Sequence, residues 1–200
     1  MKELIVASRN KGKVHEIKEL LAGLPYKVTS LLDHPDLPDV VEDGKTYRAN
    51  ALKKAVEIAR LTGQLTISDD SGLEVKALNN APGIYSARFA GEGASEGARN
   101  QKLFKMLKDV PDSKRQARYR CVIAFVDGKG RQIAVVQGTC SGMIAREERG
   151  SNGFGFDPLF ILRRYNKTFG ELPPQLKAKI SHRARALKKF RAIIEKYRSS

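Results

Sequence analysis

The first 24 residues show an order of apolar and polar positions that predicts a strand, a loop and a helix. Leu4–Ala7 is entirely apolar, which is typical of a short strand buried on both faces. The polar segment Ser8–Lys13 follows, and from Val14 to Leu24 the apolar residues recur at helical spacing. A strand, a glycine-containing loop and a helix direct backbone N–H groups and the positive end of the helix at an anion. The pattern therefore predicts a phosphate-binding loop.

Lys13 supports that interpretation. A lysine in the first turn of a helix opposes the helix macrodipole, so a phosphate ligand explains it more readily than helix stability does. The segment is not a Walker loop, because the second glycine and the Lys-Ser/Thr pair are missing.

The remaining elements are predicted from the same periodicities. The expected strands are Tyr26–Ser30 and a hairpin of Tyr119–Val126 with Ile133–Cys140. The expected helices run from about Lys45 to Leu61, from Ala94 or Ser95 to before Pro111, and from Ser181 onward. Their apolar faces are Leu52, Ala55, Val56 and Ala59; Leu103, Phe104, Leu107 and Val110; and Leu187, Phe190, Ile193, Ile194 and Tyr197.

The stretch Ile67–Val75 contains two adjacent carboxylates, Asp69 and Asp70, followed by Ser71. In an extended segment neighbouring side chains point to opposite faces, so only one of the two can face a given pocket. A carboxylate beside a buried strand is costly unless it is hydrogen-bonded, paired or bound to a metal. The composition Asp-Asp-Ser-Gly is equally typical of a turn, so both interpretations stay open.

Three further places carry candidate chemistry. Glu42 and Asp43 precede a predicted helix, either as metal or water ligands or as carboxylates that favour a helix N-terminus. The glycine-rich segment 150–160 allows close approach to a ligand, and Phe154 or Phe156 can stack on a base, although core packing is expected for one of them. Cations also stand against a helix dipole near the last helix, at Lys177, His182 and Arg183.

Length and composition indicate a globular protein that forms one compact domain or a two-lobed one, with 41% of its residues apolar and 30% charged, and we expect a single domain over residues 1–200. No apolar run approaches the roughly 20 residues of a membrane span, and the N-terminus does not resemble a signal peptide. Cys121 and Cys140 lie in predicted strands without metal-ligand spacing, as reduced core cysteines do. We therefore expect a cytoplasmic protein without a membrane partner.

The formal net charge of +15 admits several explanations. It suits nucleic-acid binding or a triphosphate substrate, and it can equally reflect the lysine and arginine usage of the source proteome. Charge alone does not decide between them.

Five segments together resemble the Ham1/RdgB family of inosine triphosphate pyrophosphatases, also called dITP/XTP pyrophosphatases. Each motif is weak alone, but all five occur in the family's order and spacing, over nearly the whole chain. They are Ser8–Lys13, Ser68–Leu73, Ala81–Arg88, Gly153–Pro158 and Ile180–Arg183.

The resemblance implies a homodimeric, Mg²⁺-dependent enzyme that cleaves purine nucleoside triphosphates between the α- and β-phosphates. The substrates would carry hypoxanthine or xanthine, and the products would be the monophosphate and pyrophosphate. The implied fold is α/β and ITPase-like (Maf/Ham1), with a long, curved mixed central sheet flanked by helices and two lobes around a cleft. A stable nucleic-acid partner is not expected.

The resemblance also implies roles for individual residues. The loop that holds the triphosphate would be Ser8, Arg9, Asn10, Lys11, Gly12 and Lys13, with Ser71 beside the substrate. Asp70 would be the proton acceptor and a metal ligand, with Glu42 as the other metal-binding carboxylate and Asp69 as a further candidate. The base and sugar pocket would be Phe154, Gly155, Phe156, Asp157, Lys177, His182 and Arg183.

One departure concerns the metal site. Many relatives have Glu-Asn-Ala in the helix after Glu42, whereas this chain has Ala49-Asn50-Ala51, so an acidic residue is missing and the full metal shell is in doubt. Selectivity should come from donors such as backbone N–H groups, His182 and Arg183, which favour the 6-keto group of hypoxanthine or xanthine over the amino group of adenine.

Two alternatives remain. A Maf-like pyrophosphatase would act on other triphosphates, although the Gly153–Asp157 and Ser181–Arg183 segments argue against it. A basic nucleic-acid-binding domain would use the Lys/Arg face of the last helix, but it leaves Asp69, Asp70 and the Ser8–Lys13 loop unexplained.

Overall fold

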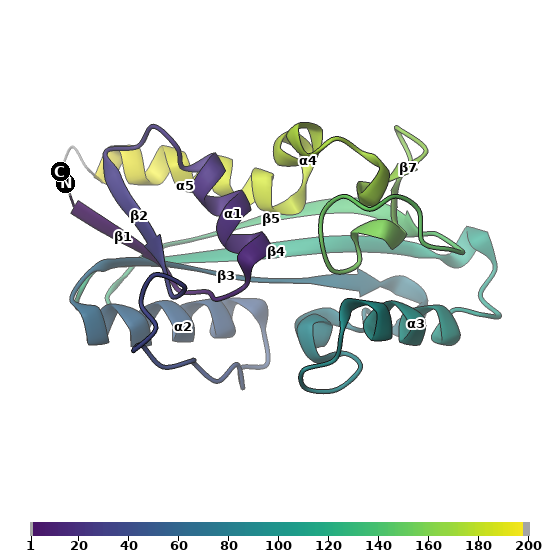
Figure 1. The fold of residues 1–200 in the computed structure, drawn as a ribbon, viewed down its shortest axis with the longest axis horizontal. Coiled ribbons are helices and arrows are strands. Elements are labelled where there is room, and N and C mark those ends of the chain that lie inside the picture. The colour runs from purple at the N-terminus through teal and green to yellow at the C-terminus, as the bar shows by residue number, and fades with distance from the viewer. Residues whose placement is uncertain (1, 198–200) are drawn as a thin grey trace. The chain divides into compact units, whose positions relative to one another are not determined.

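The computed structural model describes residues 2–197, and within them one mixed sheet carries the fold (Figure 1). Its strands are hydrogen-bonded in the order β2-β1-β3-β4-β5-β6-β7. They are β1 (Lys2–Val6), β2 (Tyr26–Ser30), β3 (Leu65–Val75), β4 (Gln116–Val126), β5 (Gln132–Ile144), β6 (Phe160–Leu162) and β7 (Lys167–Thr168). Strand β1 pairs in parallel with β2 and β3, whereas β6 pairs antiparallel with β5 and β7. The expected α/β class with a mixed sheet is confirmed.

The α-helices are α1 (Lys11–Leu20), α2 (Tyr47–Thr62), α3 (Glu96–Met106), α4 (Pro174–Ile180) and α5 (His182–Tyr197). Helices α1 to α3 lie between strands along the chain, and α4 and α5 follow the last strand. Short 3₁₀ helices are η1 (Lys76–Leu78), η2 (Gly83–Arg88), η3 (Asp112–Lys114), η4 (Asp157–Leu159) and η5 (Phe169–Glu171). No helix within residues 2–197 has the length and apolar character to span a bilayer.

The chain forms two compact units. Within the described residues, the first unit comprises 2–70, 121–138 and 183–197, and the second comprises 71–120 and 139–182. Each unit has a core of its own, because the buried apolar clusters fall within one unit or the other.

The first unit is built on the two faces of β1. Leu4 and Val6 pack with α1 and α5, whereas Ile5 and Ala7 pack with α2. Figure 1 shows α1 and α5 on one side of these strands and α2 on the other. Because successive side chains of a strand alternate between faces, a continuous apolar run such as Leu4–Ala7 must be covered on both sides.

The second unit is organised around aromatic residues of three segments. The rings of Tyr119 and Phe160 lie 4.6 Å apart between centroids, and Phe160 stacks on Phe169 at 5.4 Å. Leu103 and Leu107 of α3 belong to the same core. Helices α3 and α4 lie on opposite sides of the strands of this unit (Figure 1).

Helix α1, which follows the predicted phosphate loop, and helix α2, which precedes the acidic strand β3, both have side-chain N-caps. Asn10 accepts a hydrogen bond from the Lys13 N–H and thereby starts α1. Thr46 accepts one from the Ala49 N–H at the start of α2, and Gly63 ends α2 in the left-handed region at φ 69°. Leu24, predicted to belong to the first helix, lies beyond its C-terminal end.

The buried face of α2 is rotated by part of a turn from the apolar face predicted for it. Leu52 and Val56 are half-buried, and the buried side chains include those of Asn50 and Lys54. The two polar residues are drawn inward because they have hydrogen-bond partners on β3, so they displace apolar residues from the expected face. The full buried set is Tyr47, Asn50, Ala51, Lys54, Ala55, Ile58 and Ala59.

Two further expectations need correction. The turn interpretation of residues 69–72 was wrong, because β3 runs through them without interruption. The residues before the last helix form a separate helix, α4, which carries Lys177, whereas α5 begins at His182 close to the predicted start. The hairpin is confirmed, with longer strands than predicted.

We expect Phe190→Ala to lower the free energy of unfolding by about 3–5 kcal/mol, because it removes a fully buried ring and leaves a cavity. The Phe190 ring meets Phe125 edge-on at 5.2 Å, so their contact is lost as well. Urea denaturation measures the change. Tyr197→Ala is the control, since Tyr197 contacts the same Phe125 ring but is 37% exposed, and its cost should be clearly smaller. Equal costs would contradict this view of the core.

Candidate active site

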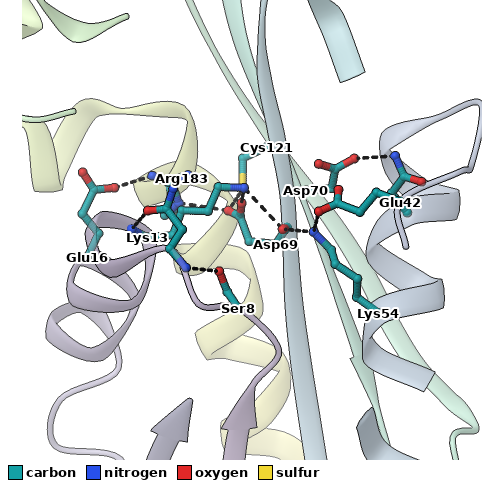
Figure 2. Close-up of polar contacts among 11 residues, drawn as sticks. Ser8, Lys13, Glu16, Glu42, Lys54, Asp69, Asp70, Cys121 and Arg183 are labelled. Carbon is teal, nitrogen blue, oxygen red and sulfur yellow. Dashed lines mark hydrogen bonds and ion pairs between the residues drawn. The ribbon is translucent and has the colours of Figure 1, made fainter. Parts of the chain in front are cut away.

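Strand β3 directs its two adjacent carboxylates to opposite faces (Figure 2). Asp69 points toward α1 and α5, where Lys13 and Arg183 bind it, and Asp70 points toward α2, where Asn50 donates to it. The alternation inferred from the sequence is confirmed. The two carboxylates therefore have different surroundings, although they are neighbours in the chain.

Asp69 lies in a buried ion-pair cluster. Its Oδ1 is 2.7 Å from Lys13 Nζ, and its Oδ2 accepts from Arg183 Nε at 2.9 Å and from Cys121 Sγ at 2.9 Å. The Asp69 side chain has no exposed surface, and that of Arg183 is 2% exposed. Three donors thus share one carboxylate that has no access to water.

The charges in this cluster support one another. Burial acts to raise the pKa of Asp69, but Arg183 and Lys13 hold that pKa well below its usual value. Burial acts to lower the pKa of Lys13, yet the Asp69 and Asp70 carboxylates together outweigh it and the net shift of the pKa is upward. Burial and the nearby Asp69 carboxylate raise the pKa of the Cys121 thiol. The thiol therefore stays protonated and donates a hydrogen bond to Asp69. Asp69 is therefore a carboxylate and Cys121 a thiol.

Arg183 joins α5 to two other elements. Besides Asp69 on β3, its guanidinium pairs with Glu16 on α1 (Figure 2). The sequence raised the question of why a cation stands at the start of a helix. Two carboxylates outweigh the unfavourable dipole, since charge-assisted hydrogen bonds from a buried guanidinium to Asp69 and Glu16 are stronger than a helix-end effect.

Asp70 shares its surroundings with Glu42 and Lys54. Lys54 Nζ lies 3.0 Å from Glu42 Oε1 and donates to the Asp69 carbonyl at 3.0 Å. Burial raises the pKa of Asp70 to about 6, with Lys54 and Lys13 opposing and Glu42 adding to the rise. Burial also acts to raise the pKa of Glu42, but Lys54 and Lys13 outweigh it, so the net shift of this pKa is downward. The group comprises two neighbouring carboxylates, each of which affects the pKa of the other, and two nearby ammonium groups.

Asn50 holds this group together. Its Nδ2 donates to Asp70 Oδ2 at 3.2 Å, and its Oδ1 accepts from the Gly44 N–H at 2.8 Å. The loop that carries Glu42 is thereby tied to Asp70 through one buried amide. Neither Asn50 nor Lys54 was predicted from the sequence to belong to the site. The signal was present, because two polar residues four apart interrupt the apolar face of α2.

The predicted phosphate loop is built from hydrogen bonds within the chain. Ser8 Oγ accepts from the Asn10 N–H at 3.2 Å, and Lys13 lies in the first turn of α1 as expected. Lys11 is exposed and Gly12 is half-buried. Arg9 points elsewhere: it pairs with Asp39 and donates to backbone carbonyls of residues 31, 35 and 37. In this structure Arg9 braces the segment after β2.

The second unit contains the residues predicted for a base pocket, except Arg183, which belongs to the first unit. Lys177 Nζ lies 2.5 Å from Asp157 Oδ2 and 4.6 Å from the centroid of the Phe154 ring. The Phe154 N–H donates to Asp157 Oδ2 at 2.9 Å. Gly153 allows this approach, because it has φ 80° and a Cβ there would lie 2.1 Å from Asp157 Oδ2. Phe156 is buried in the core whereas Phe154 is half-buried, as expected for one ring of the two.

His182 and Ser71 complete the predicted set. The His182 ring stacks on Tyr119 at 4.5 Å with an interplanar angle of 10°. Ser71 follows Asp70 in β3 and is half-buried, and Gly155 has φ 65°. The structure thus groups Lys13, Asp69 and Arg183 in one cluster and Phe154, Asp157 and Lys177 in another.

The Glu42–Asp70 pair fits a magnesium ion. Within residues 2–197 no group of three or more His, Cys, Asp and Glu side chains is arranged to hold a metal. Magnesium, however, is usually held through one or two carboxylates together with substrate phosphates and waters. Two neighbouring carboxylates repel each other when both are charged, and a divalent cation relieves that repulsion. The oxygens of Asp69 fit less well, because Lys13, Arg183 and Cys121 already occupy them.

The site of this mixed-sheet α/β protein thus consists of lysines and carboxylates gathered around one strand, and its relatives define the family. The chain belongs to the Ham1 family, whose model matches residues 4–193. It is 50% identical over 194 residues to the dITP/XTP pyrophosphatase of Desulforamulus reducens, covering 97% of this chain and 96% of that protein.

Other relatives agree. The dITP/XTP pyrophosphatase of Geobacter sulfurreducens is 49% identical over 187 residues, which cover 94% of each chain. The solved structure of a HAM1 protein from Coxiella burnetii has a TM-score of 0.89 and 40% identity, covering 98% of this chain and all of that one. The family and fold inferred from the sequence motifs are confirmed.

We expect Arg183→Met to lower the free energy of unfolding by about 3–5 kcal/mol, because it leaves the buried Asp69 and the half-buried Glu16 carboxylates without their shared cation. Urea denaturation at neutral pH measures the loss. Lys188→Met on the same helix is the matched control, since Lys188 is exposed and its replacement should change stability by about 0.5 kcal/mol at most. A small loss for Arg183→Met would show that the cluster contributes little to stability.

Proposed function

We propose that this protein hydrolyses non-canonical purine nucleoside triphosphates such as ITP, dITP and XTP to the monophosphate and pyrophosphate, and so removes them from the nucleotide pool. The observation that carries the proposal is the group of buried Asp70 and Lys54 with half-buried Glu42 and Lys13, which suits a polyphosphate and a divalent cation. Relatives that are close to half identical over nearly their whole length are named dITP/XTP pyrophosphatases.

Lys13, Lys54 and the start of α1 are proposed to bind the phosphates. The loop from Ser8 to Lys13 leads into the N-terminus of α1, where backbone N–H groups and the helix dipole favour an anion. Lys13 is held by Asp69, so its ammonium group is fixed in place before substrate arrives. A fixed cation loses little conformational entropy on binding, which favours affinity.

Asp70 is proposed to orient the attacking water and to accept its proton. The water oxygen bonds to the α-phosphorus, the bond from that phosphorus to the α–β bridging oxygen breaks, and pyrophosphate leaves with that oxygen. A base is effective when its pKa is near the working pH, and burial has raised the pKa of Asp70 to about 6. Asn50 keeps one oxygen of this carboxylate in a defined orientation.

Glu42 and Asp70 are proposed to hold Mg²⁺. The bound ion would neutralise charge on the phosphates during the reaction. Ala49 leaves this chain with one acid fewer than many relatives, so these two carboxylates are the proposed protein ligands. We do not include Asp69, because its oxygens are engaged by Lys13, Arg183 and Cys121.

The second unit is proposed to recognise the base. Phe154 offers a face for stacking, and Lys177 and His182 offer donors that favour a 6-keto group over an amino group. Arg183 is proposed to act indirectly, because its guanidinium is buried against Asp69 and Glu16. A homodimer, a cytoplasmic location and a single functional domain over residues 1–200 belong to the same proposal.

We expect the wild-type protein to release pyrophosphate rapidly from dITP and XTP with Mg²⁺, slowly from dGTP and dATP, and from none of them with EDTA. Asp70→Asn should lower kcat by about 100-fold or more, because it removes the proton acceptor. Asp109→Asn, an exposed carboxylate on the second unit, serves as the control and should keep wild-type activity. Equal turnover of all four nucleotides would refute the base selectivity. Absence of turnover with salt-steep DNA or RNA binding would favour a nucleic-acid-binding protein.

A further inference from the structure

Tyr119 contacts two of the residues proposed for base recognition, yet it belongs to none of the sequence motifs. It lies on β4 and is 7% exposed. Its ring lies parallel to the His182 imidazole, with the centroids 4.5 Å apart and 10° between the planes. Its hydroxyl donates a long hydrogen bond to Asp157 Oδ1, at 3.4 Å.

The stacking fixes the plane of the imidazole. The last torsion of a histidine side chain has a broad, roughly two-fold energy profile, so a neighbouring surface must define the ring orientation. A parallel aromatic ring defines it well, because rotation of the imidazole would drive its edge into the Tyr119 face. The direction of the ring nitrogens, and with it the direction of any hydrogen bond to a base, follows from that plane.

The hydroxyl acts on the other oxygen of Asp157. Oδ2 already accepts from Lys177 Nζ and from the Phe154 N–H, so a donor on Oδ1 limits rotation of the carboxylate. Through Asp157 the hydroxyl helps to hold Lys177, whose ammonium lies over the Phe154 ring. One side chain thus bears on His182 directly and on Lys177 through Asp157.

The Tyr119 ring also packs against aromatic residues of the core. It packs on Phe160 at 4.6 Å and lies 6.1 Å from Phe169, both of them fully buried. A ring that is packed on one side and stacked on the other has little freedom of its own. It can therefore transmit the rigidity of the core to the two polar residues.

We propose that Tyr119 is a positioning residue for base selectivity: it orients the His182 imidazole and steadies the Asp157–Lys177 ion pair, so that their donors favour a 6-keto purine. The proposal deepens the proposed function and rests on it. Selectivity that depends on hydrogen bonds requires donors with fixed directions, since a mobile donor can adapt to the wrong group.

The test uses two substitutions in the full-length protein. Tyr119→Phe removes only the hydroxyl, and Tyr119→Leu also removes the ring that stacks on His182. We expect the ratio of kcat/KM for ITP over ATP to fall about two- to threefold in Tyr119→Phe, since the lost hydrogen bond is long. In Tyr119→Leu it should fall about tenfold.

The second readout does not depend on activity. In the ¹³C–¹H spectrum of the three histidines, the His182 ring protons should show an upfield ring-current shift from Tyr119. That shift should persist in Tyr119→Phe and disappear in Tyr119→Leu. The Mg²⁺ concentration for half-maximal rate should not change in either variant.

Phe125→Leu is the matched control. Phe125 lies on the same strand, is fully buried, and packs against Phe190 in the first unit. This variant should lose stability and leave the ITP/ATP ratio and the His182 signals unchanged. A purely structural role of Tyr119 would give the same pattern as Phe125→Leu.

The outcomes separate the two proposals. Wild-type protein that releases pyrophosphate from ITP, together with an unchanged ITP/ATP ratio in the Tyr119 variants, would overturn the role of Tyr119 alone. Wild-type protein that releases none would overturn the proposed function and, with it, this inference. If Tyr119→Leu does not fold, the ratio in the nearly isosteric Tyr119→Phe decides.

Discussion

The fold of the first unit depends on neutralising one carboxylate in the middle of a buried strand. Asp69 has no exposed surface, and an unpaired charge there would cost several kcal/mol. Helix α1 supplies Lys13, α5 supplies Arg183, and β4 supplies the Cys121 thiol. Segments that are 56 and 114 residues from Asp69 in the chain are thereby fixed to β3 at one point. The cationic start of α5 is explained by the same requirement.

This constraint links structure to the proposed chemistry. The ion pair that neutralises Asp69 also fixes Lys13, and the adjacent residue, Asp70, is directed to the opposite face of β3. There it meets Glu42 and Lys54 rather than a full set of donors, so its pKa is raised while that of Asp69 is lowered. The pKa values of two adjacent carboxylates are thus shifted in opposite directions, which is how pairs of acids acquire different roles in enzymes.

Much of the fold and part of the site could be predicted from the sequence, because both follow local rules. The apolar run of β1, the Asn10 cap, the hairpin and the opposite orientation of Asp69 and Asp70 are set by short-range periodicity and chemistry. Roles that depend on distant partners could not be read in the same way. Arg9 binds residues 31–39, and Asn50 and Lys54 turn inward toward β3, since their partners are close only after folding. The resemblance to a family supplied the function, which no single motif would have given.

The central claim is that Asp69 stabilises the fold whereas Asp70 serves the chemistry. The most direct test compares the free energies of unfolding of Asp69→Asn and Asp70→Asn by urea denaturation at pH 7.5. Asp69→Asn leaves Arg183 and Lys13 buried without their carboxylate, so we expect a loss of about 3–5 kcal/mol. Asp70→Asn removes a charge that burial and Glu42 disfavour, so stability should be unchanged or higher. An equal loss for both variants, or a larger loss for Asp70→Asn, would contradict the account.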